Sequence, residues 1–233
     1  LVRRSTFLAA GNCSKHSAIA PIARARVTPK PISRLRKPSK KTLPEALERI
    51  RAEHPDASIE LWAEDEHRIG LKPILRRVWC KKGQRPLVTV QPRYKWTYLY
   101  GFVCPDSGQS FWLLLPRVAV AVWTLVLAEF AAAVGAGESK QIVLVIDQAG
   151  WHRSDTVVVP QGVHVVFQPA YSPEVQPAER LWRLSDEALV NECFSDLDGL
   201  IEAQTERCRR LCEQPEIIRT HTLFHWWPKV AIP

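Results

Sequence analysis

The clearest feature of the hydrophobic pattern is a run of apolar, mostly β-branched residues that leads directly into a carboxylate. Residues 142–146 read Ile-Val-Leu-Val-Ile, and Asp147 follows them. A continuous apolar run of this length is typical of a strand buried on both faces of a sheet. The end of such a strand is where α/β sheets place their chemistry, so Asp147 is a candidate functional residue. Taken alone, the pattern favours an Asp that merely caps a turn.

A second strand, predicted over residues 58–69, carries another carboxylate on its apolar face. Apolar and polar residues alternate along it, and Asp65 falls in line with Leu61 and Ala63 by the period of two. A charge that points toward an apolar face needs a partner or a metal ion. Asp65 is therefore the second candidate. Glu66 points to the other face, where we expect a salt bridge.

The remaining patterns predict an α/β protein. Helices are expected over residues 42–50 and 118–134, from about Pro177 and from Ser195, with hairpins over 76–90 and 94–115 and a strand over 162–167. A stiff proline-rich loop over residues 169–177 precedes the helix that carries Glu179. This order of elements predicts a mixed sheet with helices on its faces.

Charge is distributed unevenly over the 233 residues. The chain has a formal net charge of +8, but residues 1–41 hold eleven Lys or Arg and no Asp or Glu, so the rest is slightly acidic. We expect a basic, mobile arm over residues 1–42 that suits a phosphate backbone, followed by one folded domain over residues 43–233. No apolar run reaches the length of a membrane span. The sequence contains no C-x-x-C pair, so we do not expect a zinc site.

Three carboxylates, Asp65, Asp147 and Glu179, have reasons to converge. Adjacent strands would bring the two Asp residues together, and the stiff loop would deliver the helix that bears Glu179. Three carboxylates in one place repel one another unless cations neutralise them. Oxygen ligands without Cys or His select Mg²⁺ or Mn²⁺, and two such ions support displacement at a phosphodiester. Glu64 or Glu66 as the first acid, and Glu174 as the third, stay open as alternatives.

The same residues carry a family resemblance. Asp65-Glu66, Asp147 with His152 five residues later, and the run Tyr-Ser-Pro-Glu-Val-Gln-Pro-Ala-Glu-Arg-Leu-Trp over 171–182 resemble the DDE transposases of the mariner superfamily, closest to their bacterial insertion-sequence branch (insertion sequence 630 type). The resemblance covers about residues 58–228. It implies an RNase H-like fold and metal-dependent DNA strand cleavage followed by strand transfer at element ends. It also implies that Asp65, Asp147 and Glu179 bind two Mg²⁺ or Mn²⁺ ions.

The chain departs from the family pattern in three ways. Gln148 stands where Asn is usual after the second Asp, the spacing from Asp147 to Glu179 is a few residues shorter, and a basic arm stands where helix-turn-helix domains are usual. We therefore expect a truncated copy. The alternative function is a catalytically inactive transposase remnant that only binds DNA, and a weaker one is a nuclease acting on RNA–DNA hybrids.

Basic residues near the first Asp predict a track for DNA. The predicted contacts are Lys72, Arg76, Arg77, Lys81, Lys82 and Arg85 of the first hairpin, together with His152 and Arg180. The alternatives are that the hairpin and Arg180 are merely solvated and that His152 forms a hydrogen bond with the backbone. The expected partners are double-stranded DNA, as element ends and target, and a second copy of the chain in a synaptic complex. The expected location is the bacterial cytoplasm, at the nucleoid.

Overall fold

The computed structural model describes residues 9–10, 42–82, 87, 90, 93–169, 172 and 175–230. Its strands are β1 (Ala9–Ala10), β2 (Ser58–Gly70), β3 (Trp96–Cys104), β4 (Gln109–Leu115), β5 (Lys140–Ile146) and β6 (Val163–Phe167). Its helices are α1 (Thr42–Glu53), α2 (Val120–Val134), α3 (Glu179–Ser185), α4 (Leu197–Cys212) and α5 (Pro215–Thr222), and a 3₁₀ turn, Asp186–Ala188, extends α3.

One mixed sheet in the order β1-β4-β3-β2-β5-β6 forms the centre of the fold. β2, β3 and β4 pair antiparallel as a meander, whereas β5 and β6 add to β2 in parallel. The parallel steps need crossover connections, and α2 provides the one between β4 and β5. This strand order is that of the RNase H-like fold, which confirms the predicted fold class.

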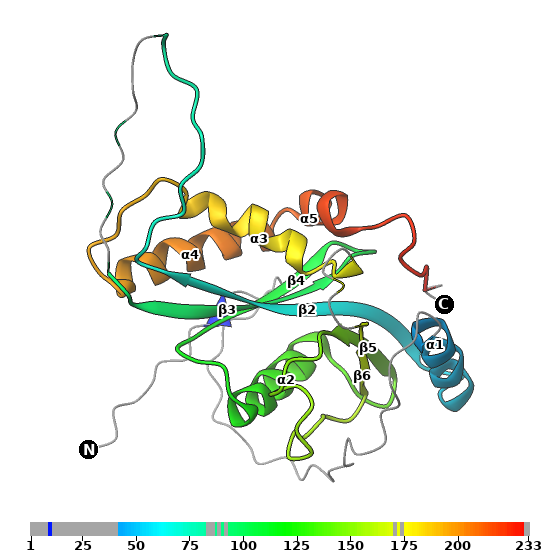
Figure 1. Ribbon diagram of the computed structural model, residues 1–233. Coiled ribbons are helices and arrows are strands. Elements are labelled where there is room, and N and C mark those ends of the chain that lie inside the picture. Colours follow the sequence, from blue (N-terminus) through cyan, green and yellow to red (C-terminus); the bar gives the residue numbers. More distant parts are fainter. Residues whose placement is uncertain are drawn as a thin grey trace.

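Helices cover both faces of the sheet and create two apolar cores. Figure 1 shows α3, α4 and α5 on one side of the sheet and α2 on the other. Alternate residues of β2 divide between them: Leu61 and Ala63 belong to the core under α3–α5, and Trp62 belongs to the core over α2. The predicted alternation along β2 is therefore confirmed. Asp65 follows the α3 side, and Glu64 and Glu66 follow the α2 side.

The central strand β2 is much longer than its parallel neighbour β5. Pairing between the two ends at Ala63 opposite Val145, whereas pairing of β2 with β3 continues as far as Gly70. From residue 64 onward, one edge of β2 is therefore no longer covered by β5. Residues 64–66 lie at the carboxyl end of β5, where α/β sheets form their binding crevices.

Some predicted elements differ from the structure. Residues 76–80, predicted as a strand of a hairpin, form no strand, and their partners are only partly described. The N-cap of α4 is Asp196, whose side chain accepts a hydrogen bond from the Gly199 N–H, rather than Ser195. Helix α5 was not predicted. The predicted basic arm lies outside the described residues except for β1 and Thr42. In the part of the chain that the structure describes, every helix is too short or too polar to cross a lipid bilayer.

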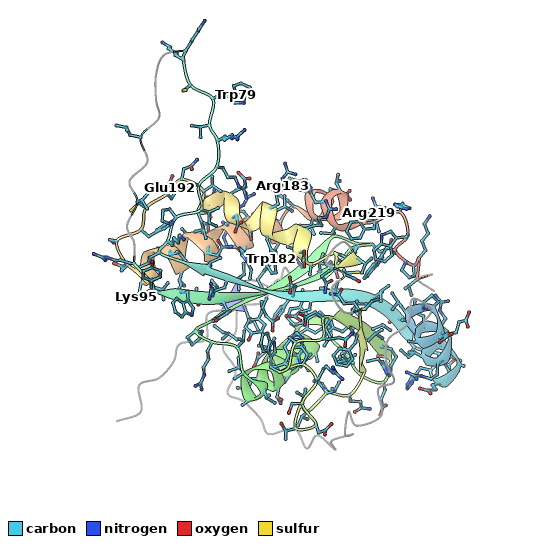
Figure 2. All side chains as sticks on the ribbon, in the orientation of Figure 1. Trp79, Lys95, Trp182, Arg183, Glu192 and Arg219 are labelled. Atoms are coloured by element: carbon cyan, nitrogen blue, oxygen red, sulfur yellow. The ribbon has the colours of Figure 1, made fainter. Side chains whose placement is uncertain are left out.

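Gly101 leaves space for a tryptophan that fixes α3 on the sheet. Gly101 lies opposite Asp65 in the β2–β3 register, and a Cβ built on it would meet the Trp182 ring at 2.7 Å. Trp182 has no room to move away, because it stacks on His67 and meets the edge of Trp112. Figure 2 shows Trp182 between α3 and the sheet.

We predict that Gly101→Ala destabilises the protein by about 1–3 kcal/mol through overpacking. The penalty should shrink in a Trp182→Phe background, because the smaller ring does not fill the space beside residue 101. Urea unfolding of the four chains in this double-mutant cycle measures the coupling. Equal penalties in both backgrounds would contradict the contact.

Candidate active site

Asp65 is held by a neutral donor from the helix above it. It lies on β2 just beyond the last residue paired with β5, and its Oδ2 accepts a hydrogen bond of 3.0 Å from the Trp182 Nε1–H. Burial, together with the charges of Glu66 and Glu179, raises the pKa of Asp65 to about 7, and the Trp182 hydrogen bond acts in the opposite direction. Asp65 is thus a carboxylate crowded by other carboxylates.

Asp147 follows β5 directly and is fixed by two donors. Its Oδ1 accepts a hydrogen bond of 2.9 Å from the Ala149 N–H and lies 2.7 Å from His152 Nδ1. Burial acts to raise the pKa of Asp147, but these two hydrogen bonds outweigh it and lower the pKa below its ordinary value. Ala63 and Val145 are the last paired residues of β2 and β5, so Asp65 and Asp147 each lie two residues beyond the end of this pairing. Asp147 is therefore an ionised carboxylate at the same edge of the sheet.

Glu179 is the first residue of α3, and its loop is attached to β2. The buried Gln176 donates from Nε2 to the Glu64 carbonyl oxygen at 2.9 Å, and Ala178 is buried in the core. These contacts deliver the start of α3 next to Asp65. The negative charge of Glu179 contributes to the raised pKa of Asp65. The Glu179 side chain is exposed, and its charge acts on Asp65, whereas Asp147 directly follows the neighbouring strand β5.

A buried imidazole lies beside Asp147. His152 Nε2 is 3.1 Å from Glu66 Oε1 and 3.8 Å from Glu64 Oε2, while Nδ1 faces Asp147. Burial alone would lower the pKa of His152, but hydrogen bonds with Asp147 and Glu66 raise it to about 9. The side chain has no exposed surface. This geometry favours a structural contact with Asp147 over the predicted contact with DNA. The expected ion pair of Glu66 on the far face of β2 is confirmed.

The predicted basic track divides into exposed and paired side chains. Lys72, Arg77, Lys81 and Lys82 are exposed, and Arg85 lies outside the described residues. Arg76 instead pairs with Glu187 at 2.7 Å and Asp186 at 3.7 Å, at the end of α3. Arg180 is exposed, with its guanidinium over the Phe224 ring. Four exposed lysines or arginines that follow β2 in the chain are thus available to an anionic partner.

Two residues with a part in this site were not predicted for it. Gln176 anchors the loop before α3, and Trp182 donates to Asp65 as well as packing in the core. The sequence signal for both was the run over 171–182 that precedes and begins α3. Glu64, the alternative first acid, is fully buried. The alternative third acid, Glu174, lies outside the described residues.

The donor chemistry fits divalent cations. Asp65, Asp147 and Glu179 offer carboxylate oxygens alone, the ligands that Mg²⁺ and Mn²⁺ prefer. Burial is the largest cause of the raised pKa of Asp65, and the charges of Glu66 and Glu179 add a repulsion that such cations would relieve. A cation bound here would be held by residues from β2, from the end of β5 and from the start of α3.

Comparison with known proteins gives related sequences in bacteria. The chain is 34% identical over 132 residues to the uncharacterized protein y4pE/y4sA of Sinorhizobium fredii, covering 56% of this chain and 96% of that protein. It is 27% identical over 175 residues to the uncharacterized 39 kDa protein of insertion element IS630 of Shigella sonnei, covering 71% of this chain. The match spans 49%, about half, of the insertion-element protein.

Solved structures of the Mos1 mariner transposase are also similar. The catalytic domain of Mos1 matches with a TM-score of 0.45 and 17% identity, covering 80% of this chain and 93% of that one. The Mos1 paired-end complex with Mg matches with a TM-score of 0.48 and 18% identity, covering 90% of this chain and 68% of that one.

A family model establishes the membership. The model described as DDE superfamily endonuclease matches residues 60–201, more than half of the chain, and this range includes Asp65, Asp147 and Glu179. Together with the insertion-element relative, the match confirms the predicted resemblance to transposases of the insertion sequence 630 type. The chain belongs to the DDE superfamily endonuclease family, a family of enzymes.

Proposed function

We propose that this chain is the catalytic domain of a transposase that cleaves and joins DNA strands at the ends of an insertion sequence. The observation that supports the proposal is that Glu179 acts on Asp65 near the end of the β2–β5 pairing, where Asp147 follows β5. We further propose that residues 43–233 form this domain and that the basic segment 1–42 adds contacts to DNA phosphates. Such a substrate would place the protein at the bacterial nucleoid, in the cytoplasm.

In this proposal, the three carboxylates hold two Mg²⁺ or Mn²⁺ ions. When bound, the ions stabilise the attacking and leaving oxygens of a phosphodiester displacement. Trp182 orients the Asp65 carboxylate through Oδ2, and His152 with the Ala149 N–H orients Asp147 through Oδ1. Gln176 keeps the start of α3 against β2, so Glu179 stays near Asp65. Exposed Lys72, Arg77, Lys81, Lys82 and Arg180 would contact the DNA backbone.

We predict that Asp147→Asn abolishes DNA cleavage, with a loss of at least about 100-fold, because the amide cannot replace an anionic metal ligand. The substrate is an end-labelled duplex that carries the sequences flanking this gene, incubated with Mg²⁺ or Mn²⁺. Asp155→Asn, an exposed acid of the same loop, is the matched control and should cleave normally.

A gel-shift assay on the same duplex separates the two functions. Both variants should bind the DNA, because neither change removes a basic residue. Binding without cleavage by the unchanged chain, in either metal, would instead establish the inactive, DNA-binding remnant.

The pKa of Asp65 predicts how metal binding depends on pH. With a pKa of about 7 in the folded chain and an ordinary value when unfolded, the metal-free protein should lose stability as pH rises from about 4 to about 7. Mn²⁺ needs the ionised carboxylate, so its affinity should rise over the same range and level off above it. Trp182→Phe removes the bond that lowers this pKa, and should shift both profiles to higher pH.

Thermal melting between about pH 5 and about pH 8, with EDTA or with Mn²⁺, measures both effects. Phe224→Leu, which changes another aromatic residue near α3 without contacting Asp65, is the control. Profiles of wild type and Trp182→Phe that coincide would contradict the role of the indole N–H.

A second copy of the chain is the proposed protein partner. The described residues that follow β2, including 76–82, project from the body of the molecule (Figures 1 and 2), and the segment between β2 and β3 (the β2–β3 loop) carries fully exposed Trp79 and Leu87. Tyr94 and Leu75 of the same loop are 79% and 58% exposed. Exposed apolar side chains gathered on one segment are typical of an interaction site. A synaptic complex brings together two DNA ends, which suits a dimer.

We predict that Trp79→Ser weakens dimerisation at least about 10-fold, since tryptophans dominate the energy of interfaces. Sedimentation velocity with the end duplex present measures the change. Leu125→Ser, an exposed apolar residue on α2, is the control and should leave assembly unchanged. A monomer at all concentrations in the unchanged chain would refute the dimer.

A further inference from the structure

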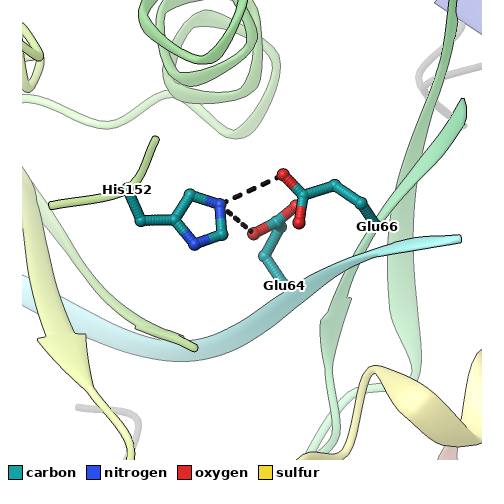
Figure 3. A group of neighbouring side chains, drawn as sticks. All are labelled: Glu64, Glu66 and His152. Atoms are coloured by element: carbon teal, nitrogen blue, oxygen red, sulfur yellow. Dashed lines mark hydrogen bonds and ion pairs between the residues drawn. The ribbon is translucent and has the colours of Figure 1, made fainter. Parts of the chain in front are cut away.

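Glu64, Glu66 and His152 meet on the α2 side of β2, on the opposite face of that strand from Asp65. Two of the side chains come from β2, and the third comes from the turn after β5, as Figure 3 shows. One ligand atom of each lies within 4.8 Å of the other two. The side chains of Glu64 and His152 are completely buried, and that of Glu66 is 6% exposed. The cluster is therefore an enclosed arrangement, unlike the acids of an exposed surface.

Glu64 is the least satisfied member of the cluster. In the described part of the chain, no group donates a hydrogen bond to either of its carboxylate oxygens, and its closest positive partner is His152 Nε2 at 3.8 Å. A fully buried carboxylate without hydrogen bonds is costly, and proteins retain one where it serves a purpose such as binding an ion. Glu64 points toward the same atom of His152 as Glu66 does.

His152 is oriented as a histidine ligand usually is. Metal-binding histidines commonly donate one ring N–H to a carboxylate, which turns the other nitrogen toward the metal. Here Nδ1 lies 2.7 Å from Asp147 Oδ1, and Nε2 faces Glu64 and Glu66. The Trp123 ring packs against the imidazole at 4.5 Å, and the Trp151 Nε1–H donates to Glu66 Oε1. Both aromatic rings therefore help to fix the cluster.

We propose that Glu64, Glu66 and His152 bind one divalent transition-metal ion at a site separate from the Asp65, Asp147 and Glu179 carboxylates. The mixed set of two carboxylates and one imidazole favours Mn²⁺ or Zn²⁺ over Mg²⁺, which prefers oxygen ligands alone. An ion bound here would take the Nε2 lone pair in place of the Trp151 N–H, which lies 3.1 Å from Nε2 and would keep its bond to Glu66 Oε1, and any proton on Nε2 would leave to solvent. The ion would also fix His152, and through it Asp147, at the edge of the sheet.

The imidazole provides a direct spectroscopic test with Mn²⁺ as the probe. The full chain carrying Asp65→Asn and Glu179→Gln loses two of the three carboxylates of the other site but keeps Asp147 and this cluster. Pulsed EPR of Mn²⁺ added to this double variant should show coupling to a ring nitrogen. His152→Asn should abolish the coupling. Because the other site is disabled in this background, the result is independent of whether the proposed transposase function is correct.

Affinity measurements complete the test. In the same background, Glu64→Gln should weaken Mn²⁺ binding at least about 10-fold, because it replaces a ligand with a neutral amide of equal size. Glu60→Gln, on the same face of β2 but paired with Lys140, should leave the affinity unchanged. Mn²⁺ should raise the melting temperature of the double variant and of the Glu60→Gln chain, and should fail to raise that of the Glu64→Gln chain.

Three results would overturn the proposal. They are the absence of nitrogen coupling in the double variant, coupling that survives His152→Asn, and equal Mn²⁺ affinity with and without the Glu64 carboxylate. If the Glu64→Gln chain does not fold, Glu66→Gln in the same background gives the same comparison.

Discussion

The candidate active site depends on the point at which β5 stops pairing with β2. Up to Ala63, the hydrogen bonds of β2 are shared between β3 and β5, and its side chains are divided between two apolar cores. Beyond that residue β3 alone continues the pairing, so the next residues of β2 lie at the carboxyl end of β5 while their backbone is still held by β3. A strand that is held on one side and open on the other can present carboxylates in fixed directions. The period of two then sends Asp65 toward α3, and Glu64 and Glu66 toward α2.

Carboxylates gathered in this way repel one another, and different hydrogen-bond donors on the two faces of β2 reduce the repulsion. On the α3 side, the Trp182 indole N–H bonds Asp65 without adding a counter-charge. On the α2 side, the Trp151 N–H bonds Glu66 in the same manner, and His152 adds an imidazole between Glu66 and Asp147. Indole donors leave the net charge negative, so the attraction for cations is preserved. The raised pKa of Asp65, and that of Glu64, which burial and neighbouring acids raise well above its ordinary value, show that the repulsion is reduced but not removed.

The sequence predicted those features that follow from periodicity. The apolar run before Asp147 identified β5, and the alternation along β2 assigned Asp65 and Glu66 to opposite faces. Periodicity favoured Asp65 and left Glu64 as an alternative first acid, and it could not show that the Glu64 side chain would be fully buried. It also could not place His152 or Gln176, since both act through contacts with residues about 86 to 112 positions away in the chain. The strand predicted over 76–80 was wrong for a related reason: its apolar residues face solvent on a projecting loop rather than a sheet core.

The helix that carries Glu179 is joined to β2 along its whole length, and this ties the projecting loop to the acids. Gln176 bonds the Glu64 carbonyl before α3 begins, Trp182 bonds Asp65 in its middle, and Asp186 lies 3.0 Å from His67 at its end. Asp186 also pairs with Arg76 at the base of the β2–β3 loop, where Ile74 forms a bridge with Val190. His67 stacks on Trp182, so three side chains in contact, those of Asp186, His67 and Trp182, connect Arg76 at the loop base with Asp65. A partner that fixes the loop would therefore act on a rigid unit that includes the Asp65 carboxylate, since closely packed side chains transmit displacement rather than absorb it.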